Sequence, residues 1–185
     1  GLDILAYLIE KAHAENIKIH AWVNPLRVTT GTQANQNTDV SKLAAANPAR
    51  QHPEWTVAYA DGKLYYDPAI PEVRKLIADG VKEIAENYDV DGILFDDYFY
   101  PYPVSENGAI IDFDDADSYS KYGNGKDKGD WRRANVNAMI EECHTAIKSV
   151  NTDCKFGVAP FGIWRNDDGK NGGSDTSGLE SYKSI

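Results

Sequence analysis

Residues 91–101 read Asp91-Gly-Ile-Leu-Phe-Asp-Asp-Tyr-Phe-Tyr-Pro101, an apolar run that ends in two carboxylates and a group of aromatic rings. The apolar part has no polar break, which is typical of a parallel strand buried on both faces. Because side chains alternate across a strand, Leu94 and Asp96 should share one face, and Phe95 and Asp97 the other. The stretch therefore predicts a buried strand whose carboxyl end carries a functional site.

Two interpretations of the Asp96-Asp97 pair compete. Asp favours turns and prolines follow closely, so the pair can be read as the start of a solvated turn. Adjacent acids among aromatic rings also suit a sugar site, in which carboxylates do acid–base work and flat rings stack on a pyranose. We favour the sugar site and expect Tyr98 and Tyr100 to contact the saccharide.

Composition places the chain among ordinary globular proteins. Its 185 residues, 42% of them apolar and 26% charged, fit a single domain spanning residues 1–185. No run approaches the roughly 18 apolar residues of a membrane span, and the first residues do not resemble a signal peptide. Any targeting segment is therefore expected elsewhere in a longer parent protein. We expect Cys143 and Cys154 to be two buried thiols rather than a disulfide.

The charge distribution limits the class of ligand. The net charge is −10, and residues 89–130 alone contain eleven Asp and Glu residues against three Lys. Nucleic acids and anionic membranes bind clustered Lys and Arg, so neither is an expected partner. A neutral or cationic ligand is expected instead.

Helical and strand patterns alternate along the chain. We predict helices over residues 3–15 and 71–88 and another that Asp130 caps, and strands over residues 17–23, 93–95 and 155–159. This order is typical of an α/β fold with parallel strands, and long loops after strands place function at the carboxyl ends of the sheet.

The strand at residues 17–23 has one apolar face and one unusual face. The unusual face carries His20 and Trp22 and continues into Asn24 and Arg27. Outside a barrel such a face would simply meet solvent, but inside one it lines the cavity and its mouth. His20 alone would more often be a hydrogen-bonded core histidine. Together the four residues indicate a ligand-binding floor.

Two long insertions follow strands. In residues 26–69 we predict a short helix over residues 40–46 and a β-ribbon that turns at Asp61-Gly62. Residues 104–129 have no periodic pattern, and we expect both insertions on the same side of the sheet as Asp96.

Four aspartates crowd into residues 112–117. They raise calcium as an alternative, but their spacing does not match the calcium-binding loop of an EF-hand. We favour aspartates that cap a short helix through Tyr119 and Tyr122.

Three strand ends together resemble one known family. They are His20-Ala-Trp-Val-Asn-Pro-Leu-Arg27, Asp91 to Pro101, and Gly157-Val-Ala-Pro-Phe-Gly-Ile-Trp-Arg-Asn166. With Asp130-Trp-Arg-Arg-Ala-Asn-Val-Asn137 they resemble the glycosyl hydrolase-like family 10, also described as domain of unknown function 187. The resemblance implies a (β/α)8 TIM-barrel glycosidase, of which this chain holds roughly strands 3 to 5 with their helices and long loops. It also implies a bacterial protein, secreted or lipid-anchored, that acts on glycans such as cell-wall polysaccharide.

The resemblance assigns roles to the site residues. Asp96 is the expected nucleophile or base, and Asp97 orients it or binds sugar hydroxyls. The other expected contacts to the saccharide come from His20, Trp22, Asn24, Arg27, Tyr98, Tyr100, Trp164 and Arg165. No cofactor and no metal is expected.

Two alternatives remain open. One is a carbohydrate-binding protein without a competent acid pair. The other is a metal-dependent hydrolase that uses Asp96, Asp97 and His20, although one histidine is a poor match for zinc enzymes. A sheet of only three barrel strands would also have two open edges, so we expect the fragment to self-associate or to fold long loops across the gap.

Overall fold

The computed structural model describes residues 2–96, 99–160 and 167–173. Its centre is a parallel sheet in the order β1-β4-β7, formed by His20–Val23, Gly92–Phe95 and Lys155–Val158. β4 lies in the middle and pairs Val23 with Phe95 on one side and Phe95 with Val158 on the other. The predicted α/β class is thereby confirmed, and the strand that precedes Asp96 lies in the middle of the sheet.

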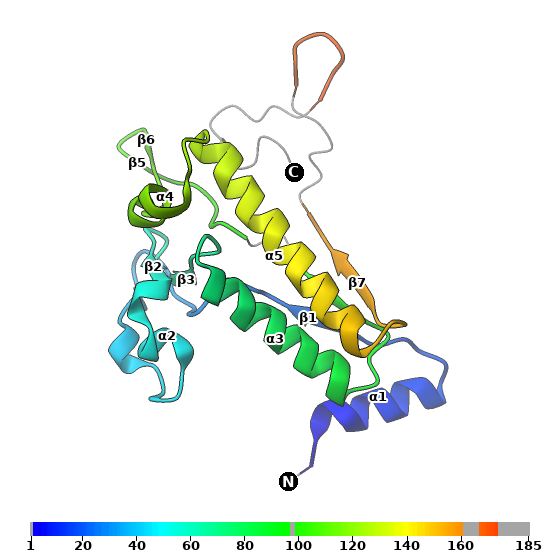
Figure 1. Cartoon of the computed structure of the whole chain (residues 1–185). Coiled ribbons are helices and arrows are strands. Elements are labelled where there is room, and N and C mark those ends of the chain that lie inside the picture. Colours follow the sequence, from blue (N-terminus) through cyan, green and yellow to red (C-terminus); the bar gives the residue numbers. More distant parts are fainter. Residues whose placement is uncertain (1, 97–98, 161–166, 174–185) are drawn as a thin grey trace.

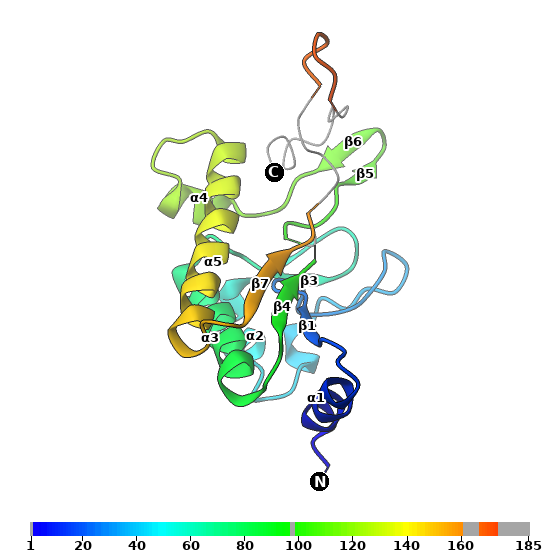
Figure 2. The same ribbon diagram turned by 90° about the vertical axis from the view of Figure 1, so that its right-hand side faces the viewer.

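Helices α3 (Pro71–Asn87) and α5 (Lys128–Val150) cover one face of this sheet, as Figures 1 and 2 show. α1 (Ile4–Ala14) lies near the amino ends of the strands. The elements between β1 and α3 are η1 (Val40–Lys42), α2 (Pro48–Gln51), η2 (Pro53–Trp55), β2 (Thr56–Ala58) and β3 (Leu64–Tyr66). Those between β4 and α5 are β5 (Val104–Glu106), β6 (Ala109–Ile111) and α4 (Ala116–Tyr122).

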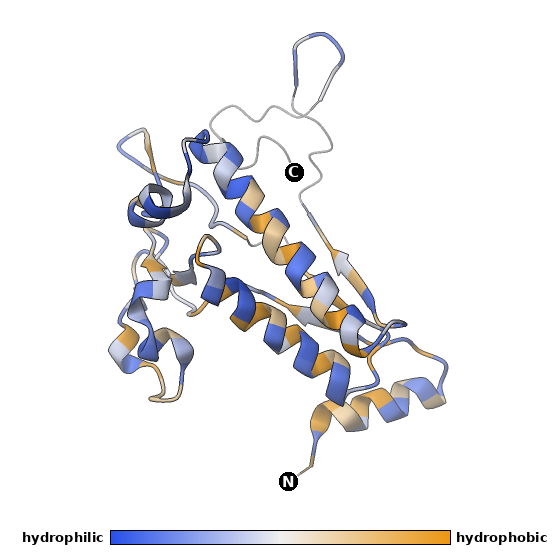
Figure 3. Ribbon diagram, viewed as in Figure 1, coloured by the Kyte–Doolittle hydropathy of each residue, from blue (hydrophilic) through white to orange (hydrophobic). Residues whose placement is uncertain are grey.

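The main core lies between the sheet and the two long helices. Ile93 and Phe95 are fully buried there, and apolar stripes of α3 and α5 pack with them; Figure 3 shows these stripes as orange bands along otherwise blue helices. The helix positions that contribute are Val73, Ile77, Val81, Ala85, Met139, Cys143 and Ile147. Strand alternation thus sends Phe95 toward the helices, as the sequence predicts.

The opposite face of the sheet has no helical layer in the described part of the chain. Trp22, on this face, is 74% exposed. Such exposure of a tryptophan is unusual, because tryptophan is among the side chains whose burial contributes most to stability. This face is called the open face below.

Both cysteines are free and buried, so the expected pair of buried thiols is confirmed. Burial raises the pKa of the Cys143 thiol to about 12. A thiol with so high a pKa is protonated at neutral pH and unreactive.

Two local predictions need correction, and one short helix was not predicted. The helix expected over residues 40–46 is only the short turn η1, because the backbone is already extended at Leu43, where ψ is 159°. Asn47 instead caps α2, which the sequence pattern did not predict. The cap of α5 is Asp127 rather than Asp130, since the helix begins at Lys128 and the Asp127 carboxylate accepts from the backbone N–H of Asp130.

The second insertion also contains a hairpin that the sequence analysis missed. β5 and β6 pair antiparallel around Asn107 and Gly108, both of which have positive φ angles, 51° and 80°. Asn-Gly is the strongest short hairpin signal, so this element was readable from the sequence. The helix through Tyr119 and Tyr122 is confirmed as α4, but Asp115 makes no side-chain capping bond to it.

The two insertions meet beyond the carboxyl ends of the strands (Figure 1). The predicted β2–β3 ribbon is confirmed, and from it the Tyr59 hydroxyl donates to the Ile111 carbonyl at 2.8 Å and accepts from the Val104 N–H at 3.0 Å. A second apolar cluster, Tyr59, Tyr65, Tyr100 and Phe113, fills the space between them. Tyr59 therefore fastens the hairpin of one insertion to the ribbon of the other.

Among the described residues, none of the helices has the length and apolar character that crossing a bilayer requires.

Candidate functional site

Asp96 stands at the carboxyl end of β4 and Asn24 at the carboxyl end of β1. The two strands are parallel neighbours in register, so the first residue after each strand meets the other. The Asn24 side-chain nitrogen lies 3.1 Å and 3.3 Å from the two carboxylate oxygens of Asp96. Asp96 is only 8% exposed, so this amide donor supports a carboxylate that is largely removed from water.

The orientation of the Asn24 amide is itself fixed. Its Oδ1 accepts a hydrogen bond from the backbone N–H of Arg27 at 3.0 Å. An ionised carboxylate only accepts, so Nδ2 must face Asp96 and Oδ1 must face Arg27. The turn after β1 thus holds the amide in place, and the amide holds the carboxylate.

His20 and Trp22 lie on the open face, the same face as Asn24 and Asp96. His20 pairs with Gly92, and a Cβ atom at position 92 would lie 3.1 Å from the His20 ring and 2.9 Å from the Lys155 carbonyl. The missing side chain of Gly92 therefore leaves room for the imidazole beside the neighbouring strand. Arg27 is exposed at the start of the first insertion. The four residues of the predicted floor thus occur along one strand and its exit, and Asn24 among them contacts Asp96.

Tyr100 has a different placement from the one predicted. It is 5% exposed, with its ring edge-on to Phe113 and beneath the Arg132 guanidinium, whose central carbon lies 5.4 Å from the ring centroid. Its hydroxyl is 3.4 Å from the Asn135 amide nitrogen, and burial raises the pKa of the phenol. Because this packing buries the ring, we leave Tyr100 out of the proposed saccharide contacts.

A buried ion-pair network beside Tyr100 was missed by the sequence analysis. Arg132 donates to both carboxylate oxygens of Asp115 at 2.7 Å and 2.8 Å, to Asp112 at 2.8 Å, and to the Phe113 carbonyl at 3.0 Å. Lys128 adds contacts of 3.0 Å to Asp115 and 2.7 Å to Asp112. The network ties the second insertion to the first turns of α5.

Protonation in this network follows from these contacts. Burial opposes charge on Arg132, but the hydrogen bonds that it donates to Asp115 and Asp112 outweigh this effect and raise the pKa of the guanidinium. Partial burial likewise opposes charge on Asp112, and the donors Arg132 and Lys128 lower the pKa of its carboxyl. Asp112 and Asp115 thus serve ion pairs, and within the described ranges no cluster of three or more potential ligands is placed to hold a metal ion.

Asp67 is a second buried acid near the network. Its Oδ1 accepts from the Ala69 N–H at 2.9 Å, and Ser118 of α4 supplies another hydrogen bond. Burial raises the pKa of its carboxyl, and the hydrogen bonds only partly offset that effect. Asp67 therefore joins the start of α3 to the second insertion, and it carries its charge at a cost in stability.

Four predicted site residues lie outside the described residues: Asp97, Tyr98, Trp164 and Arg165.

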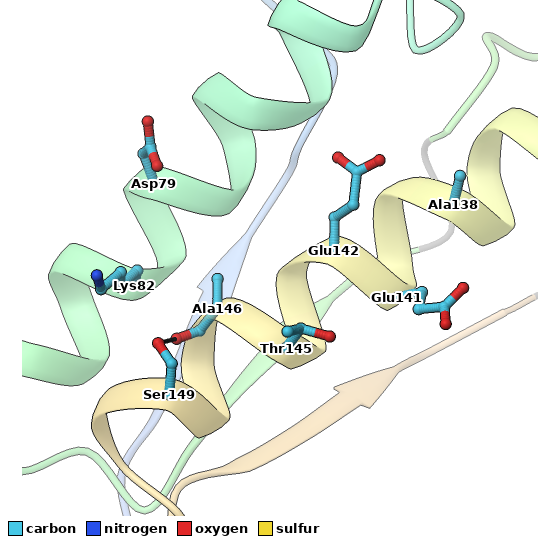
Figure 4. A pocket seen from close by; sticks show the side chains of 8 residues that line it. All are labelled: Asp79, Lys82, Ala138, Glu141, Glu142, Thr145, Ala146 and Ser149. Atoms are coloured by element: carbon cyan, nitrogen blue, oxygen red, sulfur yellow. Dashed lines mark hydrogen bonds between the residues drawn. The ribbon is translucent and has the colours of Figure 1, made fainter.

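A shallow groove on the opposite side of the molecule lies between α3 and α5 (Figure 4). Asp79 and Lys82 line it from α3, and Glu141 and Glu142 from α5. Asp79 and Glu142 are already paired with Lys75 and Arg74. The groove lies on the outer surface of the helices, and the sheet separates it from the open face.

Comparison with known sequences identifies the family. The sequence model of the glycosyl hydrolase-like 10 family matches residues 1–183. The chain belongs to the glycosyl hydrolase-like 10 family. The family predicted from the three strand ends is confirmed.

Two similar proteins are much longer than this chain. It is 41% identical to the glycosyl hydrolase YngK of Bacillus subtilis (strain 168) over 190 residues, which cover the whole chain and 35% of YngK. It is 37% identical to the glycosyl hydrolase DigH of Escherichia coli (strain K12), over 98% of the chain and 41% of DigH. The chain thus spans between about a third and two fifths of the length of these relatives.

Two solved structures share the fold. The α-L-fucosidase isoenzyme 2 from Paenibacillus thiaminolyticus aligns with a TM-score of 0.51 at 17% identity, over 85% of this chain and 23% of the enzyme. The α-galactosidase from Lactobacillus brevis aligns with a TM-score of 0.51 at 14% identity, over 98% of this chain and 20% of the enzyme. At these identities the likeness concerns the fold alone. The two enzymes have folds of the TIM-barrel type, and this chain shares their α/β arrangement.

Proposed function

We propose that this chain carries the catalytic strand of a glycoside hydrolase that acts on a polysaccharide. The observation that supports this proposal is the Asp96 carboxylate, buried at the carboxyl end of β4 and fixed by the oriented amide of Asn24. Catalytic groups in parallel α/β barrels lie at the carboxyl ends of strands, and a carboxylate there suits acid, base or nucleophilic work on a glycosidic bond.

In this proposal Asp96 is the nucleophile or base and Asp97 orients it or binds hydroxyls. His20, Trp22, Asn24 and Arg27 form one side of the saccharide site, and Tyr98, Trp164 and Arg165 add contacts. The distance from Asp96 to a second carboxylate decides the outcome: about 5 Å implies retention of configuration, and about 6.5–9.5 Å implies inversion.

The family and the parallel sheet support a wider proposal about the parent protein. β1, β4 and β7 correspond to strands 3 to 5 of a (β/α)8 barrel, and the described sheet ends at β1 and β7 as edge strands. The parent is a secreted, periplasmic or lipid-anchored bacterial protein, and its substrate is a cell-wall or related glycan. Exposed edges of this kind pair with other chains, so we also propose that the isolated chain self-associates; light scattering that shows a strict monomer would count against this.

The test of catalysis is Asp96→Asn in the intact protein, assayed against a panel of bacterial glycans. We expect cleavage to fall below a tenth of the wild-type rate while the thermal midpoint barely changes, because the carboxylate serves chemistry rather than packing. Asp114→Asn, at an exposed position, is the matched control and should keep full activity. Retention of more than a tenth of the rate by Asp96→Asn would move the nucleophile elsewhere.

One alternative function is a carbohydrate-binding protein without catalysis, which the exposed Trp22 beside Asp96 also fits. Binding of glycans with no cleavage of any of them by the wild-type protein would favour this alternative.

A further inference from the structure

The first insertion begins with an unusual polar loop. Residues 29–38, called the amide loop here, read Thr-Thr-Gly-Thr-Gln-Ala-Asn-Gln-Asn-Thr and contain no charged residue, in a chain of which 26% is charged. The loop begins two residues after the turn that orients Asn24, the residue whose amide contacts Asp96. Figure 2 shows it in light blue, extending from the carboxyl end of β1 away from α3 and α5, on the open side of the sheet.

The backbone of the amide loop is held rigidly. Thr29 Oγ1 donates to the Asn37 carbonyl at 2.6 Å and accepts from the Leu64 N–H at 2.8 Å. The Asn37 N–H donates to the Gly62 carbonyl at 2.8 Å, and its amide donates to the Thr30 carbonyl at 3.1 Å. These bonds close the base of the loop and fasten it to the β2–β3 ribbon.

The tip of the loop is closed as well, while its amide side chains face outward. Thr32 and Asn35 exchange two backbone hydrogen bonds of 3.0 Å each. The side chains of Gln33, Asn35 and Gln36 are exposed, and within the described part of the chain the loop's own hydrogen bonds do not use them. A rigid backbone that presents amide groups costs little entropy on binding, since only the side chains remain to be ordered.

Resting on the proposed function, we propose that the amide loop is a distal subsite that binds a neutral stretch of a polysaccharide chain extending from Asp96. Each amide offers a carbonyl acceptor and two N–H donors, which match sugar hydroxyls that both donate and accept. The absence of charge from the loop suits an uncharged glycan in a protein of net charge −10. The loop thereby adds affinity for long chains over short ones.

The test measures binding against chain length. The triple variant Gln33→Ala/Asn35→Ala/Gln36→Ala is made in an Asp96→Asn background, so that no ligand is cut. Isothermal titration uses cello-oligosaccharides and chito-oligosaccharides of two to six units. We expect the Kd of the six-unit ligand to rise about tenfold, the effect of losing one or two neutral hydrogen bonds, while the Kd of the two-unit ligand stays unchanged.

Controls separate this proposal from general damage and from the proposed function. Asn87→Ala, at the far end of α3, should change no Kd, and the triple variant should keep the parent's thermal midpoint. Three results would overturn the subsite proposal. The triple variant could have the same Kd as the Asp96→Asn protein at every ligand length, or it could lose the same affinity at every length. The Asp96→Asn protein could also fail to bind either series of oligosaccharides. Cleavage is measured separately, with the wild-type protein. A length-dependent loss of binding together with no cleavage by the wild-type protein would sustain the subsite and refute catalysis, whereas cleavage by the wild-type protein with no effect of the loop on binding would do the reverse.

Discussion

Replacement of Arg132 by methionine should destabilise the protein more than any surface substitution on α5. Arg132 makes two hydrogen bonds to Asp115 and one each to Asp112 and the Phe113 carbonyl. Asp115 is 1% exposed, so the substitution leaves a buried carboxylate whose remaining cationic contact is Lys128 at 3.0 Å. Loss of one member of a buried pair costs about 3–5 kcal/mol, and because Lys128 remains we expect about 3 kcal/mol.

Urea unfolding followed by tryptophan fluorescence is the suitable assay, because Trp131 is buried next to the network and packs on Tyr119. The neighbouring Arg133→Met is the matched control. Arg133 pairs with Asp130, whose carboxylate is largely exposed, and such surface pairs contribute about 0–1 kcal/mol. A total stability of about 5–15 kcal/mol makes the two variants easy to tell apart.

A double variant tests the physical reason. Arg132→Met/Asp115→Leu removes both charges, and apolar replacement of a whole buried pair is often neutral or stabilising, so it should recover most of the loss. The reasoning is refuted if the free energies of unfolding of Arg132→Met and Arg133→Met differ by less than about 1 kcal/mol. It is also refuted if the double variant is less stable than Arg132→Met alone.

Three further changes test other parts of the structure. Gly62→Ala should lower the thermal midpoint more than Gly125→Ala, because both have φ between 70° and 90° but only a Cβ at position 62 would meet backbone, at 2.1 Å. Burial raises the pKa of Asp67, so ionisation of its carboxyl lowers the stability of the folded state. This cost is absent below pH about 4, where the carboxyl is protonated in both the folded and the unfolded state, and it grows as pH rises through the folded pKa. Asp67→Asn should therefore gain stability over wild type, by urea midpoint, at pH 7 but not at pH 4. Asn24→Asp places a second carboxylate against Asp96 and should shift the acid limb of the activity profile to higher pH, which an unchanged profile would disprove.

Local patterns in the sequence were enough to predict the centre of the fold. The apolar run Ile93 to Phe95 is typical of a buried strand, and the spacing from Pro71 to Tyr88 is helical throughout. Both elements occur close to the predicted bounds. The family resemblance adds that three such strand ends belong together. Asp96 and Asn24 were both singled out, but their hydrogen bond depends on the register of β1 against β4, which the sequence does not reveal.

The missed features depend on contacts between distant residues. Asp115 resembles a helix cap in the sequence, yet its carboxylate turns to Arg132, 17 residues later, because a buried acid is more stable beside a guanidinium than at a solvated helix end. Tyr100 resembles a sugar platform because it follows the two aspartates, and only the packing of the second insertion shows its ring enclosed. The Asn107-Gly108 hairpin is different, since its signal was local and readable.

The two hydrogen bonds of Tyr59 have a consequence for protein engineering. The ribbon supplies the phenol, and the hairpin supplies the Ile111 carbonyl and the Val104 N–H. Each segment therefore depends on the other to satisfy its hydrogen bonds. A β5–β6 hairpin grafted from a homologue without its own ribbon would lose the hydrogen-bond partner of two backbone groups, the carbonyl at position 111 and the N–H at position 104. Chimeras designed to alter ligand preference should therefore exchange both segments as one unit, with the recombination points placed inside β1, α3, β4 and α5.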